Sequence, residues 1–464
     1  MRVLVLIHRY LGLFVSIFVL LWCLSGFVMM YVQYPEYSHS EQLGDLDPLD
    51  FNDCCVLPDD WSDDFSFTSA EIDSFLGKPV LRIAAGHESW SIDLLSGKTI
   101  GKIDAAVASS VVERRGSGPV EYKGMVERDQ WTVAGGYDKH RPLHHFALQN
   151  DVDTEWYISG TTGQLVLETT GRERFWNWFG AVIHWLYPTE LRRHVNAWSQ
   201  TVIWLSVGAS FLTLTGLYVG IARYRQGRRS PYRGWFLWHH YSGLLFGLFT
   251  LTWVVSGLLS MTPFGAFSGR DISVERENIR GGEQNFGRLA SSLAGLDWNQ
   301  IEPGAVQLTG SMFAGEFAWI AWNPDGGAAR IGTALSIDQL TVRAAHVRPH
   351  MEIESLGLIN QADAYYYSHH DSRTFPVFRI VYEDGERYYL DAISGELLSA
   401  LDSGRRWARW LFHGLHRGDF SAWARQRPVW DLFMLFLMGG VTLGAATGTY
   451  LAWKRMARPV GLKN

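Results

Sequence analysis

Four histidines of the chain recur at matching positions in its two halves. His8 of the first half corresponds to His239 of the second, and His184 corresponds to His416 at almost the same offset along the chain. An ionisable residue within or beside a membrane span is costly to insert and is usually functional. Two neutral imidazoles on facing helices are the axial ligands that a b-type haem requires. The spacing therefore predicts one haem between His8 and His239 and a second between His184 and His416, with haem iron as the bound metal.

Two further histidines and two glycines lie close to the predicted ligands in the sequence. His240 and His413 lie beside the predicted ligands and are possible substitutes for them. Gly12 and Gly243 lie one helical turn after the first predicted pair, on the same helix face, where a missing side chain would admit a flat macrocycle. The same glycines would also let helices pack closely. Both pairs have a simpler interpretation, as interfacial or surface histidines among tryptophan and arginine, and the sequence leaves it open.

Other candidate sites are weaker. The histidines at 140–145 and 369–370 and the aspartates at 59–64 match no zinc or calcium spacing, and we interpret them as solvated loops. The chain has no Cys-x-x-Cys-His motif, which excludes covalent haem attachment. It also lacks a P-loop and a dinucleotide fingerprint. Electrons would therefore come from a separate donor, a quinol or a cytoplasmic reductase.

The three cysteines give little evidence for a disulfide. Cys23 falls in an apolar run, and Cys54 and Cys55 are adjacent. Adjacency rules out an ordinary disulfide, because the two Cα atoms of a bridge usually lie farther apart. We predict unpaired thiols.

Four apolar runs must position the histidines. They contain no charged residue and cover residues 10–33, 195–222, 241–269 and 432–453. Each run exceeds the roughly 20 residues that a helix needs to cross the hydrocarbon core of a bilayer. The first lacks a small-residue cleavage site, so we expect it to remain as an anchor. The runs predict four transmembrane helices.

Basic residues predict the orientation of these helices. Five arginines lie between the second and third runs, and further Lys and Arg residues lie in the C-terminal tail and before the first run, with no Asp or Glu in these stretches. By the positive-inside rule all three stretches are cytoplasmic. The long segments between the runs would then be periplasmic, in a protein of the bacterial inner membrane with both termini in the cytoplasm.

The predicted fold is a membrane α-helical protein built as a duplicated half, with two periplasmic α+β domains. Short strands are expected at 90–93, 156–158 and 386–391, each followed by a glycine-containing turn. Segments rich in Trp and Arg precede the second and fourth helices and are typical of interfacial helices. The predicted order is transmembrane helix 1 (1–33), periplasmic domain 1 (34–171), interfacial helix (172–194), transmembrane helix 2 (195–222), cytoplasmic loop (223–238), transmembrane helix 3 (239–264), periplasmic domain 2 (265–403), interfacial helix (404–428), and transmembrane helix 4 with its tail (429–464).

Several motifs together resemble the PepSY-associated transmembrane family. They are His8–Leu13 with Ser25-Gly26, the repeat His239–Leu244 with Ser256-Gly257, the Thr-Gly-x-Tyr sequences at 215–218 and 447–450, and Ser394–Leu397, which is similar to a PepSY strand end. The resemblance covers nearly the full length. Arg9 departs from the pattern, because it replaces one of two tandem histidines at the start of a helix.

The resemblance implies an activity. The family includes haem-containing siderophore reductases of iron uptake, and its ligands would fall on His8, His239, His184 and His416. We therefore expect an oxidoreductase with two b haems that passes electrons across the bilayer to a periplasmic ferric siderophore and releases Fe(II), without nucleic-acid binding. Two alternatives remain: a membrane-anchored binding or regulatory protein without redox activity, and a transporter of an iron chelate.

Overall fold

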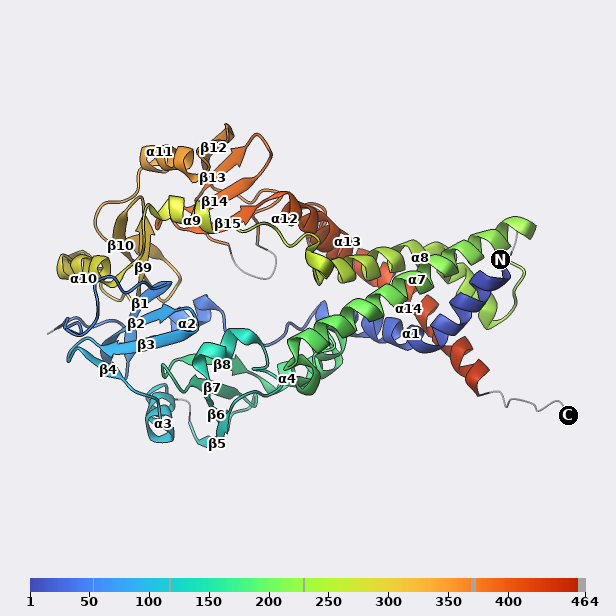
Figure 1. Cartoon of the computed structure of the whole chain (residues 1–464). Coiled ribbons are helices and arrows are strands. Elements are labelled where there is room, and N and C mark those ends of the chain that lie inside the picture. The colour runs from blue at the N-terminus through green and yellow to red at the C-terminus, as the bar shows by residue number, and fades with distance from the viewer. Residues whose placement is uncertain (53, 117, 228–229, 369–372, 458–464) are drawn as a thin grey trace. The chain divides into compact units, whose positions relative to one another are not determined.

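The computed structural model describes residues 1–52, 54–116, 118–227, 230–368 and 373–457. Its contacts divide the chain into two compact units. The helical unit comprises Met1–Tyr34, Glu173–Gly269 and Ser403–Asn464, and the sheet unit comprises Pro35–Arg172 and Arg270–Asp402. Figure 1 shows both units coloured along the chain.

Four long apolar helices build the helical unit: α1 (Arg2–Met29), α7 (Val195–Gly227), α8 (Trp235–Ser260) and α14 (Val429–Met456). The mean hydropathy of their most apolar windows lies between 1.7 and 2.4, and each helix is long enough to cross a bilayer. Large apolar side chains such as Phe211, Leu245 and Phe436 are exposed on the bundle. Small polar side chains such as Ser206 and Ser242 are buried. This distribution suits helices surrounded by lipid and confirms the prediction of a membrane protein.

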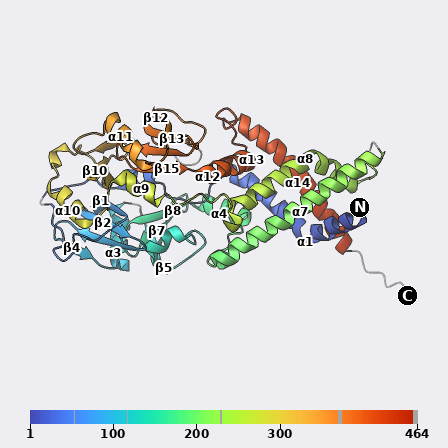
Figure 2. The same ribbon diagram turned by 45° about the horizontal axis from the view of Figure 1, so that its top comes forward.

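The four helices pack as a bundle in which α1 and α8 are diagonal partners. Both α1 and α8 contact α7 and α14 along their length. Figures 1 and 2 show the four helices side by side in both views. The interior includes Val15, Val19 and Ala209, which are buried together. Side chains that point inward from α1 and α8 therefore face one another across the bundle.

Short helical segments precede α7 and α14. The first set is α4 (Gly171–Phe179), α5 (Ala181–His184) and α6 (Thr189–Arg192), and the second is α12 (Ser403–Ala408), a π-helix (Arg409–Gly414) and α13 (Leu415–Arg417). Phe175, Trp176 and Trp178 of α4 are exposed. These short segments carry His184 and His416.

A seven-stranded antiparallel sheet lies at the centre of the sheet unit. Its strand order is β11-β10-β9-β1-β2-β3-β4. The strands are β1 (Ser69–Phe75), β2 (Lys78–Ala85), β3 (Glu88–Asp93), β4 (Lys98–Ile100), β9 (Gln307–Phe313), β10 (Glu316–Trp322) and β11 (Ala328–Arg330). Strands β1 and β9 pair with Ile72 opposite Leu308, so the sheet joins segments from both halves of the chain.

Two four-stranded antiparallel sheets complete this unit. The first has the order β5 (Val120–Val126), β6 (Leu143–Leu148), β7 (Glu155–Ser159), β8 (Leu165–Thr169), and the second β12 (Ile353–Ile359), β13 (Val377–Tyr382), β14 (Arg387–Asp391), β15 (Leu397–Leu401). The accompanying helices are α2 (His39–Asp45), α3 (Ala105–Arg114), α9 (Ser273–Arg280), α10 (Phe286–Ala294) and α11 (Ile337–Val347). The predicted strands coincide with β3, β7 and β14, and the α+β prediction is confirmed.

A turn glycine packs each four-stranded sheet against the central sheet. Gly163 has a φ of +72°, and a Cβ there would lie 2.4 Å from the Phe75 ring. Gly395 has a φ of +80°, and its Cβ would lie 2.4 Å from the Phe313 ring. Both positions need glycine for the backbone conformation and for space.

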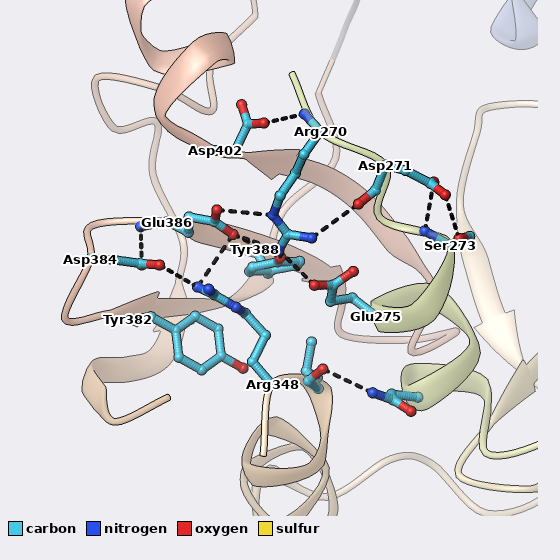
Figure 3. A network of polar contacts seen from close by, with 12 residues as sticks. Arg270, Asp271, Ser273, Glu275, Arg348, Tyr382, Asp384, Glu386, Tyr388 and Asp402 are labelled. Carbon is cyan, nitrogen blue, oxygen red and sulfur yellow. Dashed lines mark hydrogen bonds and ion pairs between the residues drawn. The ribbon is translucent and has the colours of Figure 1, made fainter. Parts of the chain in front are cut away.

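A charged network holds the ends of the second segment of the sheet unit (Figure 3). Arg270, its first residue, donates to both carboxylate oxygens of Glu386 at 3.1 and 2.8 Å and pairs with Glu275 at 2.6 Å. The backbone N–H of Arg270 donates to Asp402, its last residue. Arg348 lies 3.3 Å from Glu386 and adds a second cation. The network ties together the two points at which the chain enters and leaves this segment.

The prediction of unpaired thiols at Cys54 and Cys55 is wrong. The structure joins them in a disulfide across a cis peptide bond. The sequence argument relied on the Cα separation of an ordinary bridge, and the two Cα atoms are 3.1 Å apart here. Cys23 is free and lies within α1.

Candidate functional site

The helical unit brings His8 and His239 together. The residues lie on the diagonal helices α1 and α8, and their ring centres are 6.2 Å apart with an angle of 33° between the ring planes. His8 Nδ1 lies 2.9 Å from the carbonyl oxygen of Leu212 on α7. His239 Nδ1 lies 3.1 Å from the carbonyl oxygen of Gly444 on α14. Each flanking helix therefore orients one ring.

Two glycines let these rings lie against the flanking helices. A Cβ on Gly216 would be 2.6 Å from Cε1 of His8, and a Cβ on Gly448 would be 3.0 Å from Cε1 of His239. Gly12 and Gly243, singled out from the sequence, are less crowded. A Cβ on Gly12 would approach Leu212 at an ordinary 3.6 Å, and a Cβ on Gly243 would meet no described atom within 4 Å. The glycines that the rings require are those of the Thr-Gly-x-Tyr sequences.

A second pair forms between His184 and His416, whose ring centres are 6.1 Å apart with an angle of 77° between the ring planes. His184 Nδ1 lies 3.1 Å from the Ser25 hydroxyl and 3.2 Å from the Trp22 carbonyl oxygen, both on α1. On α8, Ser256 and Trp253 provide the same two contacts to His416 Nδ1, at 3.0 and 3.1 Å.

The hydrogen bonds determine which ring nitrogen carries the proton. A carbonyl oxygen only accepts, so Nδ1 of each of the four rings must be the N–H donor. The Ser25 hydroxyl donates to the Leu21 carbonyl at 2.7 Å and is left to accept from His184. Within the described chain, the hydrogen bonds of all four rings are made through Nδ1. Nε2 of each ring therefore keeps its lone pair, the arrangement that metal-binding histidines have when the second nitrogen is hydrogen-bonded.

The pair His184–His416 lies outside the four long helices, and burial dominates its electrostatics. Burial lowers the pKa of His184 to about 4, and burial together with the neighbouring His184 lowers the pKa of His416 to about 3. Both rings are therefore neutral at pH 7. A histidine that binds a metal must be in this form.

The two substitutes considered from the sequence lie in other surroundings. His240 is buried, and both of its ring nitrogens are engaged, Nδ1 with the Ser230 hydroxyl at 2.7 Å and Nε2 with the Gly220 carbonyl at 2.9 Å. It therefore links α8 to α7, through Gly220, and to the segment between the two helices, through Ser230. His413 packs edge-on against Phe412, with 5.6 Å between ring centres.

Sequence analysis missed the contact between Phe412 and His416. The Phe412 ring stacks on the His416 ring at 5.1 Å with an angle of 23° between the planes. Gly180 occupies the corresponding position of the first half, so the two halves differ here. The four-residue spacing of Phe412 and His416 was the available signal, because residues four apart on a helix lie on one face.

No other described residues form a candidate metal centre. In the parts of the chain that the structure describes, no group of three or more His, Cys, Asp and Glu side chains could hold a metal ion. The cluster His369-His370-Asp371 lies outside the described residues.

The two histidine pairs are separated along the bundle. His8 and Trp22 are fourteen positions apart on α1, as are His239 and Trp253 on α8. At 1.5 Å per residue the two pairs lie about 21 Å apart along the helix axes.

Comparisons with known proteins agree with this architecture. The model of the family described as PepSY-associated TM region matches residues 5–455, which is nearly the full chain. No curated protein matches the sequence significantly. The family resemblance drawn from the sequence motifs is confirmed, and the chain belongs to the PepSY-associated transmembrane family.

Proposed function

We propose that the protein is a haem-containing reductase of the bacterial inner membrane that passes electrons across the bilayer to a periplasmic ferric siderophore and releases Fe(II). The observation that carries the proposal is the presence of two histidine pairs in one bundle, each with Nδ1 held by a hydrogen bond and Nε2 available. The pair His8–His239 is the inner site, and the pair His184–His416 is the outer site.

The spacing of each pair suits two ligands of one iron. A metal–imidazole bond of about 2.0–2.1 Å, with about 1.2 Å from nitrogen to ring centre, places two opposite ring centres about 6.4–6.6 Å apart. The observed separations of 6.2 and 6.1 Å are within a few tenths of an ångström of this value. Aromatic rings also pack at about 4.5–7 Å without a ligand. The spacing therefore supports the proposal only together with the hydrogen bonds that free Nε2.

Each residue of the sites has a defined task. His8 and His239 would hold one haem b and His184 and His416 the other, and a bound haem would supply reversible one-electron exchange between Fe(III) and Fe(II). Leu212, Gly444, Trp22 and Trp253 provide the carbonyls that accept from Nδ1 of the four rings and so fix the tautomer of each ring. The two pairs are separated by about 21 Å along the helix axes, so a haem at each pair would supply two electron-carrying sites at different depths of one bundle.

The correspondence between the two halves of the chain supports two haem sites. The carbonyl acceptors Leu212 and Gly444 occupy corresponding positions of the two halves, and so do the serines Ser25 and Ser256. The residues that hydrogen-bond to the rings therefore recur at the same offsets between the two halves as the histidines do. We propose that the two halves arose by duplication and that each half supplies one ligand to each haem.

The orientation follows from charge. The arginine-rich connection between α7 and α8 and the basic C-terminal tail would be cytoplasmic under the positive-inside rule. The inner site would then accept electrons from a quinol or a cytoplasmic reductase, and the sheet unit would be periplasmic. Reduction of a siderophore-bound Fe(III) weakens its hold by hard oxygen ligands, because Fe(II) has a lower charge density.

The test is ferric-siderophore reduction by the purified full-length protein in proteoliposomes supplied with a quinol as electron donor, measured as formation of a coloured Fe(II)–chelator complex. The variants His8→Ala and His184→Ala should each abolish the reaction. His87→Ala is the matched control, because His87 is an exposed histidine of the sheet unit. Full activity in either site variant would contradict the proposal. A wild-type protein free of haem would favour a membrane-anchored binding protein.

A further inference from the structure

The two histidine pairs are not equivalent, although their hydrogen bonds correspond. The ring planes of His8 and His239 meet at 33°, whereas those of His184 and His416 meet at 77°. The angle between two ring planes depends on the rotation of each ring about its Cβ–Cγ bond. A side chain that stacks on the face of one ring can restrict this rotation.

Phe412 is positioned to do so. Its ring stacks on His416 at 5.1 Å and 23°, so the plane of His416 approximately follows the plane of Phe412. The Phe412 ring is itself in contact with a cation, because the guanidinium of Arg417 lies 5.0 Å from its centre. An aromatic ring held in this way restricts the rotation of the imidazole stacked on it.

The backbone around Phe412 has an unusual conformation. Residues Arg409–Gly414 form a π-helix, which continues directly into α13 and His416. Single-turn π-helices are rare and occur often at functional sites. In the first half the corresponding position is Gly180, which lies between α4 and α5 and has no side chain to stack on His184. The restriction therefore acts on one ring of one pair.

The angle between two axial imidazoles affects the iron that they ligate. When the planes are nearly parallel, both rings donate π-electron density into the same iron d orbital, which stabilises the ferric state. When the planes are nearly perpendicular, the donation is divided between two orbitals and the ferric state is stabilised less. A protein sets the potential of a haem through its axial ligands and through the residues that orient them.

We infer that Phe412 is a positioning residue that holds the His416 ring nearly perpendicular to the His184 ring and thereby gives the outer site a higher reduction potential than the inner site. This order makes electron transfer from the inner to the outer site favourable. The inference rests on the proposed function, because it requires haem at both sites. It goes beyond that function in assigning a direction to the electron flow and a residue that sets it.

The test combines electron paramagnetic resonance of the oxidised full-length protein with a potentiometric titration followed by visible absorption. The wild type should give two low-spin ferric signals, one strongly anisotropic with a high maximal g value and one rhombic. The anisotropic signal should belong to the component of higher potential, and His184→Ala should remove it and leave the rhombic signal.

Three variants separate positioning from a general packing role. Phe412→Leu keeps an apolar side chain of similar bulk but removes the flat ring, so the anisotropic signal should become rhombic and the potential of the outer site should fall toward that of the inner site. Phe412→Tyr keeps the flat ring and should retain both wild-type properties. Phe246→Leu, on α8 against the α14 backbone at Gly440, alters an aromatic contact away from both pairs and should change neither signal.

The outcomes are distinct from those that test the proposed function. Two identical signals in the wild type, or a Phe412→Leu protein with both signals and potentials unchanged, would overturn the inference while leaving two-haem reduction intact. A wild-type protein without haem would instead refute the proposed function itself.

Discussion

Replacing Gly216 by alanine would place a methyl group 2.6 Å from Cε1 of His8 and 3.1 Å from its Nδ1. Gly216 lies one turn after Leu212 on α7, whose carbonyl oxygen accepts from His8 at 2.9 Å. The alanine methyl would therefore occupy space on the side from which the His8 ring makes this hydrogen bond. The variant tests whether close approach of the ring to α7 is needed for the inner site.

The expected cost follows from these distances. Restoring an ordinary contact of about 3.4 Å requires the ring to move by about 0.8 Å, and overpacking of this kind costs about 1–3 kcal/mol. Losing the Nδ1 hydrogen bond adds about 0.5–1.5 kcal/mol. The higher helix propensity of alanine stabilises the free and the ligand-bound chain alike and does not alter ligand binding. A penalty of about 2 kcal/mol on the ring position that binds a ligand corresponds to a roughly 30-fold weaker hold on that ligand.

The assay is haem content per chain by pyridine haemochrome, measured after extensive washing in detergent. Gly216→Ala should lose much of one haem, and Gly448→Ala should lose less, because its nearest contact is 3.0 Å. Gly208→Ala is the control on the same helix as Gly216, since a Cβ there would meet Val15 at an ordinary 3.5 Å. Equal haem content in Gly216→Ala and Gly208→Ala would refute the reasoning.

Three further predictions concern the sheet unit. Glu386→Gln should lower the free energy of unfolding by about 1–3 kcal/mol, because the guanidinium groups of Arg270 and Arg348 would lose a charged partner. Thermal unfolding of the variant should show a lower melting temperature, and its haem content should be unchanged. Burial lowers the pKa of His140 from an ordinary 6.5 to about 4. The folded state therefore binds a proton less readily than the unfolded state. His140 makes its full contribution to the free energy of unfolding above a pH of about 6.5, and up to about 3 kcal/mol of that contribution is lost as the pH falls toward about 4. His140→Gln should flatten this part of the curve of melting temperature against pH, and identical curves would contradict the assignment. Gly163→Ala should destabilise the protein by about 2–4 kcal/mol in denaturant titrations, because it combines a positive φ with overlap on Phe75.

The sequence was sufficient to predict the spans and which histidines lie together. Long charge-free runs predict membrane helices because lipid requires them to be apolar throughout, and no tertiary detail is needed. The offset between halves predicted that His8 belongs with His239 and His184 with His416, and the structure places the ring centres of the two pairs 6.2 and 6.1 Å apart. Whether these pairs bind haem is a prediction that the structure does not test.

The features missed from the sequence depend on tertiary contacts. Gly216 and Gly448 belong to the Thr-Gly-x-Tyr motifs, but their contact with the histidine rings depends on how α7 and α14 pack against α1 and α8. The pairing of β1 with β9 joins strands from opposite halves of the chain and has no local signature. The four-residue spacing of Phe412 and His416 was a signal for their stack, but the π-helix that contains Phe412 was not indicated by the residue types.

The most direct test of the central claim is the number of b-type haems per chain in wild-type, His8→Ala and His184→Ala proteins, determined by pyridine haemochrome and by reduced-minus-oxidised spectra. The account predicts two haems in the wild type and one in each variant, with the remaining spectrum differing between the two variants. A wild-type chain without haem, or variants that retain two haems, would contradict the assignment of the two histidine pairs as haem ligands.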